Sequence, residues 1–285
     1  MIPQFCGCVG SILGKKSAIA FSFAYLNFTL KYFHIVFSIL SIHIISGPMK
    51  ILLIIFFSFN SYAGLVSPFC STVEEIDIPN THMVTPRIYR GMAPLGKIDQ
   101  LLNFGITDIL IFKNQTRNEI DKEYEEIVKY EKEREINLNT IQMDFFWHKF
   151  PSYKKACEQT IDAFRLFRSI QRNENRKMYF HCTVGEDRTG YLAGLWQMLK
   201  QGKSKKTVFY EQMCSRGYER GNPNKPTYVI NEIRKDLTPL FMYMANLVET
   251  KKISMRNLTK KHCKDDIPVG GKMYTCKEPA PLCSY

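Results

Sequence analysis

Acidic residues and arginine are both missing from the first 63 residues of this 285-residue chain, and lysine supplies the only formal charge there. Apolar runs at residues 18–30, 32–45 and 51–57 fill most of that stretch. This composition excludes an ordinary globular fold for residues 1–63 and indicates a membrane or export segment. The chain also lacks internal repeats and low-complexity tracts, which excludes a repeat architecture.

The end of this segment has the organisation of a secretory signal peptide. Lys50 precedes the short apolar run 51–57, and Ser-Tyr-Ala follows at 61–63. A basic start, an apolar core and a small-x-small cleavage site are typical of such signals. We therefore expect residues 1–48 to be an upstream extension included by a mistaken start codon. Residues 49–63, which begin with methionine, are then a cleaved signal peptide, and the protein is periplasmic or secreted.

A retained membrane span is the alternative interpretation of the same segment. Residues 32–49 carry no formal charge over 18 positions and approach the length that crosses a bilayer. This alternative predicts a membrane-anchored protein, and contact with a membrane is expected only in that case.

The rest of the chain has a moderate basic excess. Residues 64–285 hold 35 basic and 27 acidic side chains, which is a formal charge of +8. This excess favours anionic substrates, but it is spread along the chain, so we predict no nucleic-acid partner. The chain is 45% hydrophobic, which is enough for one sizeable core.

Strands and helices alternate from about residue 86 onward. Helical periodicity, charged faces and stopping glycines predict helices at 95–104, 121–135, 152–171, 189–200, 205–216 and 227–249. Short apolar runs predict strands at 106–112, 140–143 and 178–181. The alternation predicts an α/β domain at 86–249, with a central sheet flanked by helices. A lead-in at 64–85 and an irregular, cysteine-bearing tail at 250–285 complete the chain.

The most informative run is His-Cys-Thr-Val-Gly-Glu-Asp-Arg-Thr-Gly at 181–190, between a predicted strand and a predicted helix. The backbone N–H groups of such a loop converge with the helix N-terminus on one point, which makes an anion site. The same positive field favours a nucleophilic thiolate at Cys182. Arg188 can donate hydrogen bonds to two phosphate oxygens and to the charge that develops during attack.

The other positions of this loop have predicted roles as well. Gly185 permits a tight turn, Thr189 can stabilise the sulfur, and His181 is expected to order the loop from beneath. The predicted substrate-binding residues are Thr183, Val184, Gly185, Glu186, Asp187 and Thr189. Six fixed residue types at fixed spacing arise by chance with odds on the order of 10^-8 per position. A buried cysteine with an unrelated surface arginine is therefore a poor explanation of the run.

At these residues the chain resembles the protein tyrosine phosphatase superfamily, whose signature is His-Cys-x5-Arg-Ser/Thr. The similarity runs from about Ile88, where Tyr-Arg-Gly opens the domain, to about Gly217. It is greatest to the compact dual-specificity branch and to the bacterial cysteine phytases that act on inositol polyphosphates. The resemblance implies a phosphocysteine intermediate on Cys182, no metal or other cofactor, and an aspartate from a mobile upstream loop as general acid. A rhodanese-type sulfurtransferase matches less well, because Arg188 and Thr189 fit the phosphatase pattern.

Two aspartates are candidates for the general acid. Asp144 lies 38 residues before Cys182, just after a predicted strand and close to Trp147. Its surroundings resemble the aspartate, tryptophan and proline loop of the family. The order departs from the family patterns, and His148 stands where the phytase form has proline. The rival is Asp187, because some family members with aspartate before the arginine have been proposed to use it. We predict Asp144 as the acid.

Substrate specificity is less determined by the sequence. Glu186 and Asp187 are expected to weaken affinity for highly charged substrates. Against that, the lysines that follow Asp144 are candidates for a basic pocket rim, as in the phytases; they are Lys149, Lys154 and Lys155. We predict a tyrosine or dual-specificity phosphoprotein phosphatase. An inositol polyphosphate or phosphoinositide phosphatase is the alternative, and a phosphate-binding pseudophosphatase is less favoured because Cys182 and Arg188 are both present.

The nine cysteines support export. Cys6 and Cys8 fall in the expected extension, and Cys182 must stay a free thiol. The remaining six allow three disulfides, with fifteen pairings; they are Cys70, Cys157, Cys214, Cys263, Cys276 and Cys283. In the alternative, Cys157 and Cys214 are ordinary buried thiols and the tail cysteines pair with one another or with Cys70. A zinc site formed by His262 and the last three cysteines is disfavoured, because the spacing matches no usual ligand pattern.

Overall fold

The computed structural model describes residues 69–267 and 273–277. The expected extension, signal peptide and membrane-span alternative at residues 1–63 lie outside the described residues. Within the described part of the chain, no helix is both long and apolar enough to cross a membrane.

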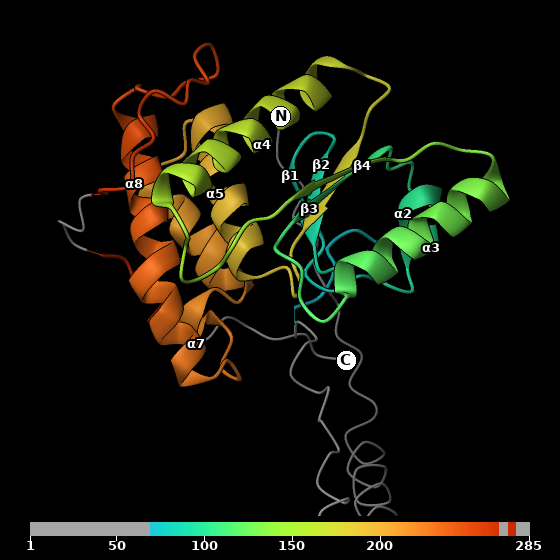
Figure 1. Cartoon of the computed structure of the whole chain (residues 1–285), viewed down its shortest axis with the longest axis horizontal. Coiled ribbons are helices and arrows are strands. Elements are labelled where there is room, and N and C mark those ends of the chain that lie inside the picture. The colour runs from blue at the N-terminus through green and yellow to red at the C-terminus, as the bar shows by residue number, and fades with distance from the viewer. Residues whose placement is uncertain (1–68, 268–272, 278–285) are drawn as a thin grey trace, which may run out of the picture. The chain divides into compact units, whose positions relative to one another are not determined.

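A five-stranded sheet lies at the centre of the domain, in the order β1-β2-β5-β3-β4 (Figure 1). The strands are β1 (His82–Thr85), β2 (Ile88–Gly91), β3 (Asp108–Phe112), β4 (Asn139–Met143) and β5 (Met178–His181). β1 pairs antiparallel with β2, whereas the other neighbouring strands run parallel. Because parallel strands end at one edge, the loops that follow β3, β4 and β5 emerge beside one another.

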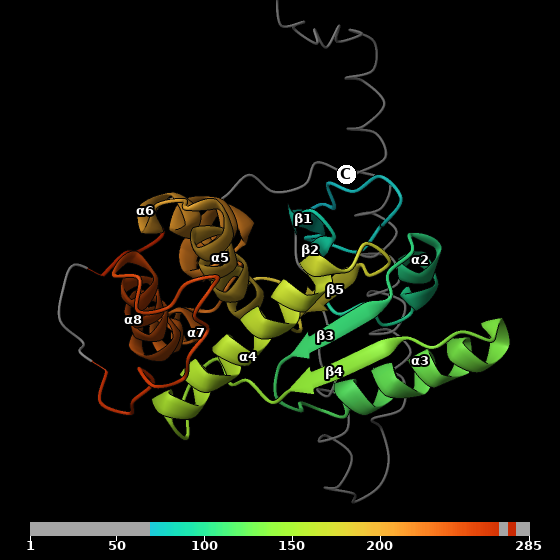
Figure 2. The ribbon, with the colours of Figure 1, turned by 90° about the horizontal axis from the view of Figure 1, so that it is seen from above.

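Helices cover both faces of this sheet (Figures 1 and 2). They are α2 (Ile98–Asn103), α3 (Glu119–Arg134), α4 (Tyr153–Arg172), α5 (Asp187–Gln201), α6 (Lys205–Val208), α7 (Thr227–Glu232) and α8 (Thr238–Glu249). Single π-helical and 3-10 turns continue α6 through Phe209–Met213 and Cys214–Arg216, and the π-helical turn Ile233–Leu237 joins α7 to α8. The α/β fold with a central sheet flanked by helices is confirmed.

Each face of the sheet has its own core. Alternate residues of β3 point to opposite faces, so Leu110 and Phe112 pack with α4, α5 and α8, while Ile109 and Ile111 pack with α2 and α3. Every residue of β3 is buried. The apolar run of this strand therefore reflects burial on both faces, as parallel strands require.

The domain begins earlier in the chain than the sequence predicted. β1 lies inside the segment 64–85, which we expected to be a lead-in, and Ile76 and Ile78 are buried in the core beside α2 and α3. The strand escapes detection because it has only four residues and its burial pattern lacks strict alternation. It forms a strand because it pairs antiparallel with β2.

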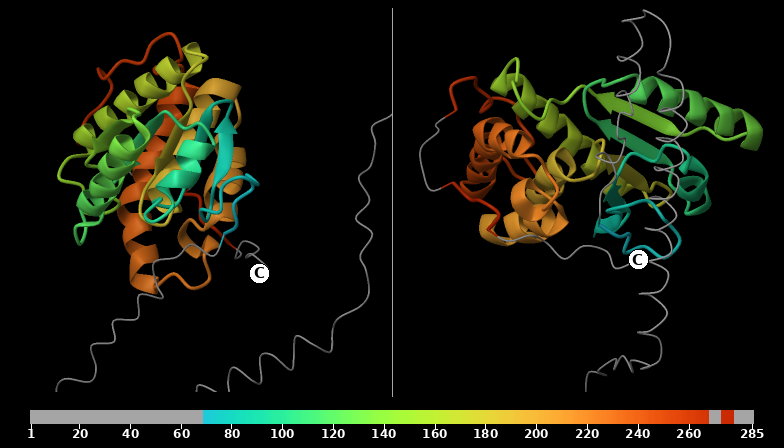
Figure 3. Two further views of the ribbon diagram at one scale, coloured as in Figure 1. Left: turned by 90° about the vertical axis from the view of Figure 1, so that its right-hand side faces the viewer. Right: turned by 90° about the horizontal axis from the view of Figure 1, so that it is seen from below.

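The tail is irregular, as expected, but it belongs to the core. Ile253, Leu258 and Ile267 are buried against the α4, α5 and α8 side of the domain. Figure 3 shows this segment running over the helices, and Arg165 of α4 donates hydrogen bonds of 3.1 and 2.8 Å to the Leu258 carbonyl. The tail therefore packs on the face of the sheet that α4, α5 and α8 cover.

Two disulfides attach the tail to the rest of the domain. Cys157–Cys263 joins it to α4, and Cys214–Cys276 joins it to the 3-10 turn Cys214–Arg216. The alternative in which Cys157 and Cys214 are unpaired buried thiols is therefore wrong, because each lies beside a tail cysteine in space. Cys263 and Cys276 cannot be zinc ligands while they are in these bonds. Cys70 is also disulfide-bonded, Cys283 lies outside the described residues, and Cys182 is the free cysteine of the described part.

Loss of the Cys157–Cys263 disulfide is expected to lower the free energy of unfolding by about 2–5 kcal/mol. The bond closes a loop over a sequence separation of 106 residues, so its removal frees a large part of the unfolded chain. Urea denaturation of the Cys157→Ala/Cys263→Ala variant measures the effect, and mildly reduced wild-type protein is the comparison. An unchanged denaturation midpoint in both would contradict a stabilising role for this bond.

Candidate active site

The loop 182–186 connects the end of β5 directly to the start of α5. Gly185 adopts a φ of 70°, in the left-handed region, and a Cβ atom there would lie 2.5 Å from the carbonyl carbon of Gly91. A side chain at this position would therefore collide with β2. The close approach of the two backbones places the loop at the carboxyl edge of the sheet, in front of the N-terminus of α5.

The Cys182 thiol is buried, with 2% of the residue exposed. Burial acts to raise the pKa of this thiol, but the positive charge of Arg188 and hydrogen bonding from Thr189 outweigh burial, so the pKa is lowered. Thr189 is fully buried, and its hydroxyl has no other hydrogen-bond partner among the described residues. The arrangement favours a thiolate, which is the nucleophilic form of cysteine.

Arg188 connects the loop to the ends of two other strands. Its Nη1 atom donates to the side-chain oxygen of Asn114, after β3, at 2.9 Å and to the carbonyl oxygen of Phe145, after β4, at 3.2 Å. Its Nη2 atom donates to the Thr183 hydroxyl at 3.4 Å. The guanidinium group is thus held beside the loop by three separate segments of the chain.

A buried arginine and an asparagine hold the loop from behind. Arg90 of β2 is fully buried, and its Nη2 atom donates to the Gly185 carbonyl at 2.6 Å. Asn80 donates to the same carbonyl at 2.9 Å. Burial and the neighbouring Arg216 lower the pKa of Arg90 to about 9, which leaves it charged at neutral pH. Sequence reasoning missed both residues, although Arg90 lies within the Tyr-Arg-Gly run that marked the start of the domain.

His181 lies beneath the loop, as a supporting residue would. Its Nδ1 atom is 2.9 Å from the Cys182 carbonyl oxygen, and its Nε2 atom is 2.8 Å from a carboxylate oxygen of Glu123. Both side chains are fully buried. Glu123 of α3 therefore orients the imidazole ring, and neither group reaches solvent to act as a general base.

Glu186 and Asp187 share one buried cation, Lys225. The Lys225 ammonium lies 3.0 Å from a Glu186 carboxylate oxygen and 2.6 Å from one of Asp187. Burial raises the pKa of Glu186 to about 7 against the opposing charge of Lys225. Because the two carboxylates face Lys225, they repel an anionic substrate less than the sequence predicted.

Replacing Lys225 by methionine is expected to lower the free energy of unfolding by about 3 kcal/mol, because it leaves the buried Glu186 carboxyl group and the half-buried Asp187 carboxylate without their cation. Adding Glu186→Gln to this variant should restore part of the loss, since one of the two charges is then removed. Urea denaturation measures both effects. Lys206→Met, at an exposed lysine of α6, is the control. Equal effects of Lys225→Met and Lys206→Met would show that Lys225 does not stabilise the loop.

A second buried lysine reaches the loop from β3. Lys113 follows the last residue of β3 and is fully buried. Its ammonium donates to the Thr183 hydroxyl at 3.2 Å and pairs with Glu119 at the start of α3. Sequence reasoning missed this residue, because it stands in a polar turn about 70 positions before the loop.

Asp144 precedes a residue that contacts the site, but within the described residues no hydrogen bond or ion pair joins its carboxylate to the loop. Asp144 is exposed, and its carbonyl oxygen accepts a hydrogen bond of 3.2 Å from Gln159. The next residue, Phe145, contacts Arg188 through its carbonyl. The carboxylate of Asp187, the rival acid, forms an ion pair with Lys225.

The three rim candidates Lys149, Lys154 and Lys155 are also exposed, around the start of α4. Their described contacts are backbone ones: the Lys149 N–H donates to Asp236 at 2.6 Å and the Lys154 N–H to Asp265 at 3.2 Å. No hydrogen bond joins their side chains to the loop within the described residues. Val184 is half-buried, and its apolar side chain has no polar atom to bind a substrate, so only its backbone groups can do so.

A model of the tyrosine phosphatase family matches residues 96–264 of this chain, whereas a search of curated proteins finds no match. Solved structures with similar folds include the core catalytic domain of the PP-IP phosphatase Siw14 from S. cerevisiae, with 20% identity over 62% of this chain and 95% of that chain, at a TM-score of 0.38. P. aeruginosa TpbA has 14% identity over 59% and 91%, at 0.38. Human DUSP28 has 15% identity over 61% and 95%, at 0.38.

Proposed function

Because the chain belongs to the tyrosine phosphatase family, we propose that it hydrolyses phosphate monoesters through a phosphocysteine intermediate on Cys182, without a metal ion. The observation that carries this proposal is the placement of the buried Cys182 thiol in the loop between β5 and the N-terminus of α5, whose second residue is Arg188. The positive charge of Arg188 and hydrogen bonding from Thr189 lower the pKa of this thiol against the effect of burial, which supports the same assignment. A thiolate, a fork of donors and a helix N-terminus at one point are the groups that phosphoryl transfer to sulfur requires.

In the first step, the Cys182 thiolate attacks phosphorus and the bond to the leaving oxygen breaks. Backbone N–H groups of the loop and Arg188 bind the phosphoryl oxygens, and a general acid gives a proton to the leaving oxygen. In the second step, water attacks phosphorus and gives a proton back to the carboxylate of the general acid, the S–P bond breaks, and the thiolate leaves with inorganic phosphate as product. Thr189 stabilises the thiolate in both steps, which is the role its position beside the sulfur supports.

We assign the general acid to Asp144. Asp187 is a poor candidate because its carboxylate is held inside the loop region by Lys225, whose ammonium lies 2.6 Å away, and accepts a hydrogen bond of 3.4 Å from the Glu219 N–H. Asp144 is exposed, and it precedes the residue whose carbonyl contacts Arg188. A small movement of this loop on substrate binding would bring the carboxyl group toward the leaving oxygen.

The proposed substrates are phosphotyrosine and mixed phosphoprotein sites. An inositol polyphosphate is the second candidate, and one observation favours it: Lys225 compensates the two acids of the loop, so they repel a highly charged substrate less. A panel of phosphotyrosine and phosphoserine peptides, phosphoinositides and inositol hexakisphosphate, assayed with and without EDTA, tests the proposal. We expect phosphotyrosine peptides to be hydrolysed fastest and chelator to have no effect. Preferential turnover of inositol hexakisphosphate would transfer the assignment to the second candidate.

We also propose that the protein is exported. Five described cysteines are in disulfides, and such bonds persist in oxidising compartments. Mass spectrometry of the mature protein is expected to find an N-terminus near Gly64 and a mass several hydrogens below that of the reduced chain. A mature chain that begins at Met1 with every cysteine reduced would refute both the expected cleavage and the disulfides.

A further inference from the structure

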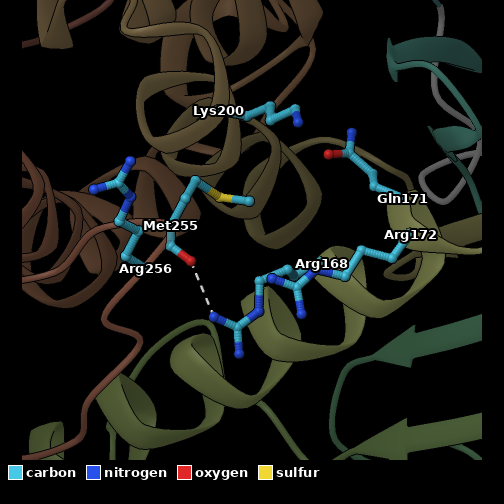
Figure 4. A pocket seen from close by; sticks show the side chains of 6 residues that line it. All are labelled: Arg168, Gln171, Arg172, Lys200, Met255 and Arg256. Atoms are coloured by element: carbon cyan, nitrogen blue, oxygen red, sulfur yellow. Dashed lines mark hydrogen bonds between the residues drawn. The ribbon is translucent and has the colours of Figure 1, made fainter.

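A hollow of about 450 Å³ lies between α4, the end of α5 and the tail, and side chains from these three segments line it (Figure 4). α4 contributes Arg168, Gln171 and Arg172, the last turn of α5 contributes Lys200, and the tail contributes Met255 and Arg256. Four of the six side chains are cationic and none is acidic. This volume lies within the range of small-molecule sites.

The four cations are not compensated by neighbouring acids. Within the described residues, none of them has a carboxylate within 4.0 Å, whereas the acids nearest along the chain are already paired. Asp162 of α4 pairs with Arg165 and with Lys260, and Glu174 lies 3.9 Å from Arg87. The tail segment 250–264 contains six lysines or arginines and no acid.

Helix dipoles account for part of this pattern but not for all of it. α4 and α5 both end beside the hollow, and cations in the last turn are common because each helix end carries about half a negative charge. Two helix ends together offset about one unit of positive charge. Four full charges line the hollow, so about three remain uncompensated, and a low-dielectric wall strengthens their field on an anion.

A hydrogen bond and a disulfide hold the walls of the hollow together. Arg168 donates a hydrogen bond of 2.9 Å to the Met255 carbonyl, drawn in Figure 4, and this bond ties the tail to α4. The Cys157–Cys263 disulfide joins the same two segments further along. The guanidinium groups of Arg172 and Arg256 make no described hydrogen bond, so they are free to bind a ligand.

We propose that this hollow binds a small anion with two or more phosphate groups, at a site separate from Cys182. Guanidinium forks match phosphate oxygens in pairs, and a multiply charged ligand would neutralise the cations that now repel one another. The site is formed by residues outside the loop 182–188, so its occupancy does not depend on the proposed catalytic reaction.

Calorimetric titration of inorganic pyrophosphate into the full chain carrying Cys182→Ser, which prevents turnover, tests the proposal. We expect two binding events per chain. Adding Arg172→Ala/Arg256→Ala should weaken one of them at least about tenfold, and adding Arg188→Ala should weaken the other. Lys122→Ala/Lys132→Ala on α3, which removes the same charge from exposed positions, should leave both unchanged at the same ionic strength.

A single binding event that Arg188→Ala abolishes would overturn the proposal, as would equal weakening by the two double variants. Failure of the proposed function would instead appear as an inactive wild-type protein with this binding intact. Sedimentation with phosphatidylcholine vesicles, with and without phosphatidylinositol bisphosphate, identifies the source of the phosphates. Vesicle binding lost in Arg172→Ala/Arg256→Ala assigns a lipid headgroup, and pyrophosphate binding without vesicle binding assigns a free phosphate compound.

Discussion

Cys182→Ser is expected to lower kcat by at least about 10³-fold while phosphate binding persists. A serine hydroxyl fills nearly the same space but is barely ionised at neutral pH, whereas the pKa of the Cys182 thiol is lowered by Arg188 and Thr189 against the effect of burial. The variant therefore loses the nucleophile and keeps the anion site. Steady-state kinetics on a phosphotyrosine peptide and calorimetric titration of phosphate measure the two properties separately.

The contrast between turnover and binding distinguishes this mechanism from its rivals. A metal-dependent hydrolase would lose activity to EDTA and regain it with added metal, and Cys182→Ser would then have a small effect. A pseudophosphatase would bind phosphate in both forms and turn over in neither. Full activity of the Cys182→Ser variant would refute the phosphocysteine mechanism.

Asp144→Asn is expected to slow the hydrolysis of poor leaving groups by about 10²- to 10⁴-fold and of activated aryl phosphates much less. The reason is that an alkyl or phenyl oxygen must gain a proton as its bond to phosphorus breaks, whereas a leaving group of low pKa departs unassisted. Kinetics with a series of leaving groups of decreasing pKa measure the difference between the two substrate classes.

Two further variants make this test specific. Glu158→Gln removes another carboxylate near the start of α4 that makes no described ion pair. It should leave the hydrolysis rates of both substrate classes, poor and activated leaving groups, unchanged. Asp187→Asn should slow the hydrolysis of both substrate classes to a similar extent, because Asp187 holds the loop in place through its ion pair with Lys225. If sensitivity to the leaving group appeared only in Asp187→Asn, the acid role would pass to the loop and Asp144 would be a surface residue.

Much of this protein was determined by its sequence because the signals are local. Apolar spacing was enough to predict α4, the charged face to predict α3, and the stopping Gly202 to predict the end of α5. The short apolar run before Cys182 was enough to predict β5. The nucleophile, the arginine and the tight glycine turn lie within one heptapeptide, so their spacing alone predicts one loop. The family match over residues 96–264 confirms the resemblance on which the proposed function rests.

The support of that loop was decided only by tertiary structure. Asn80 and Arg90 reach the Gly185 carbonyl across sequence separations of 105 and 95 residues, and Lys225 reaches Asp187 across 38. No local periodicity records such distances, because a polar residue in a turn has the same local pattern whether it faces water or a buried carbonyl.

The same reason applies to the disulfides and to the charges of the loop. Six cysteines allow fifteen pairings, and only packing of the tail on α4 and on the 3-10 turn Cys214–Arg216 brings Cys263 to Cys157 and Cys276 to Cys214. Glu186 and Asp187 look like repulsive charges in the sequence. Folding buries Glu186 and places both carboxyl groups around Lys225. A carboxylate that leaves water must pair with a cation, and which cation lies beside it depends on the whole fold.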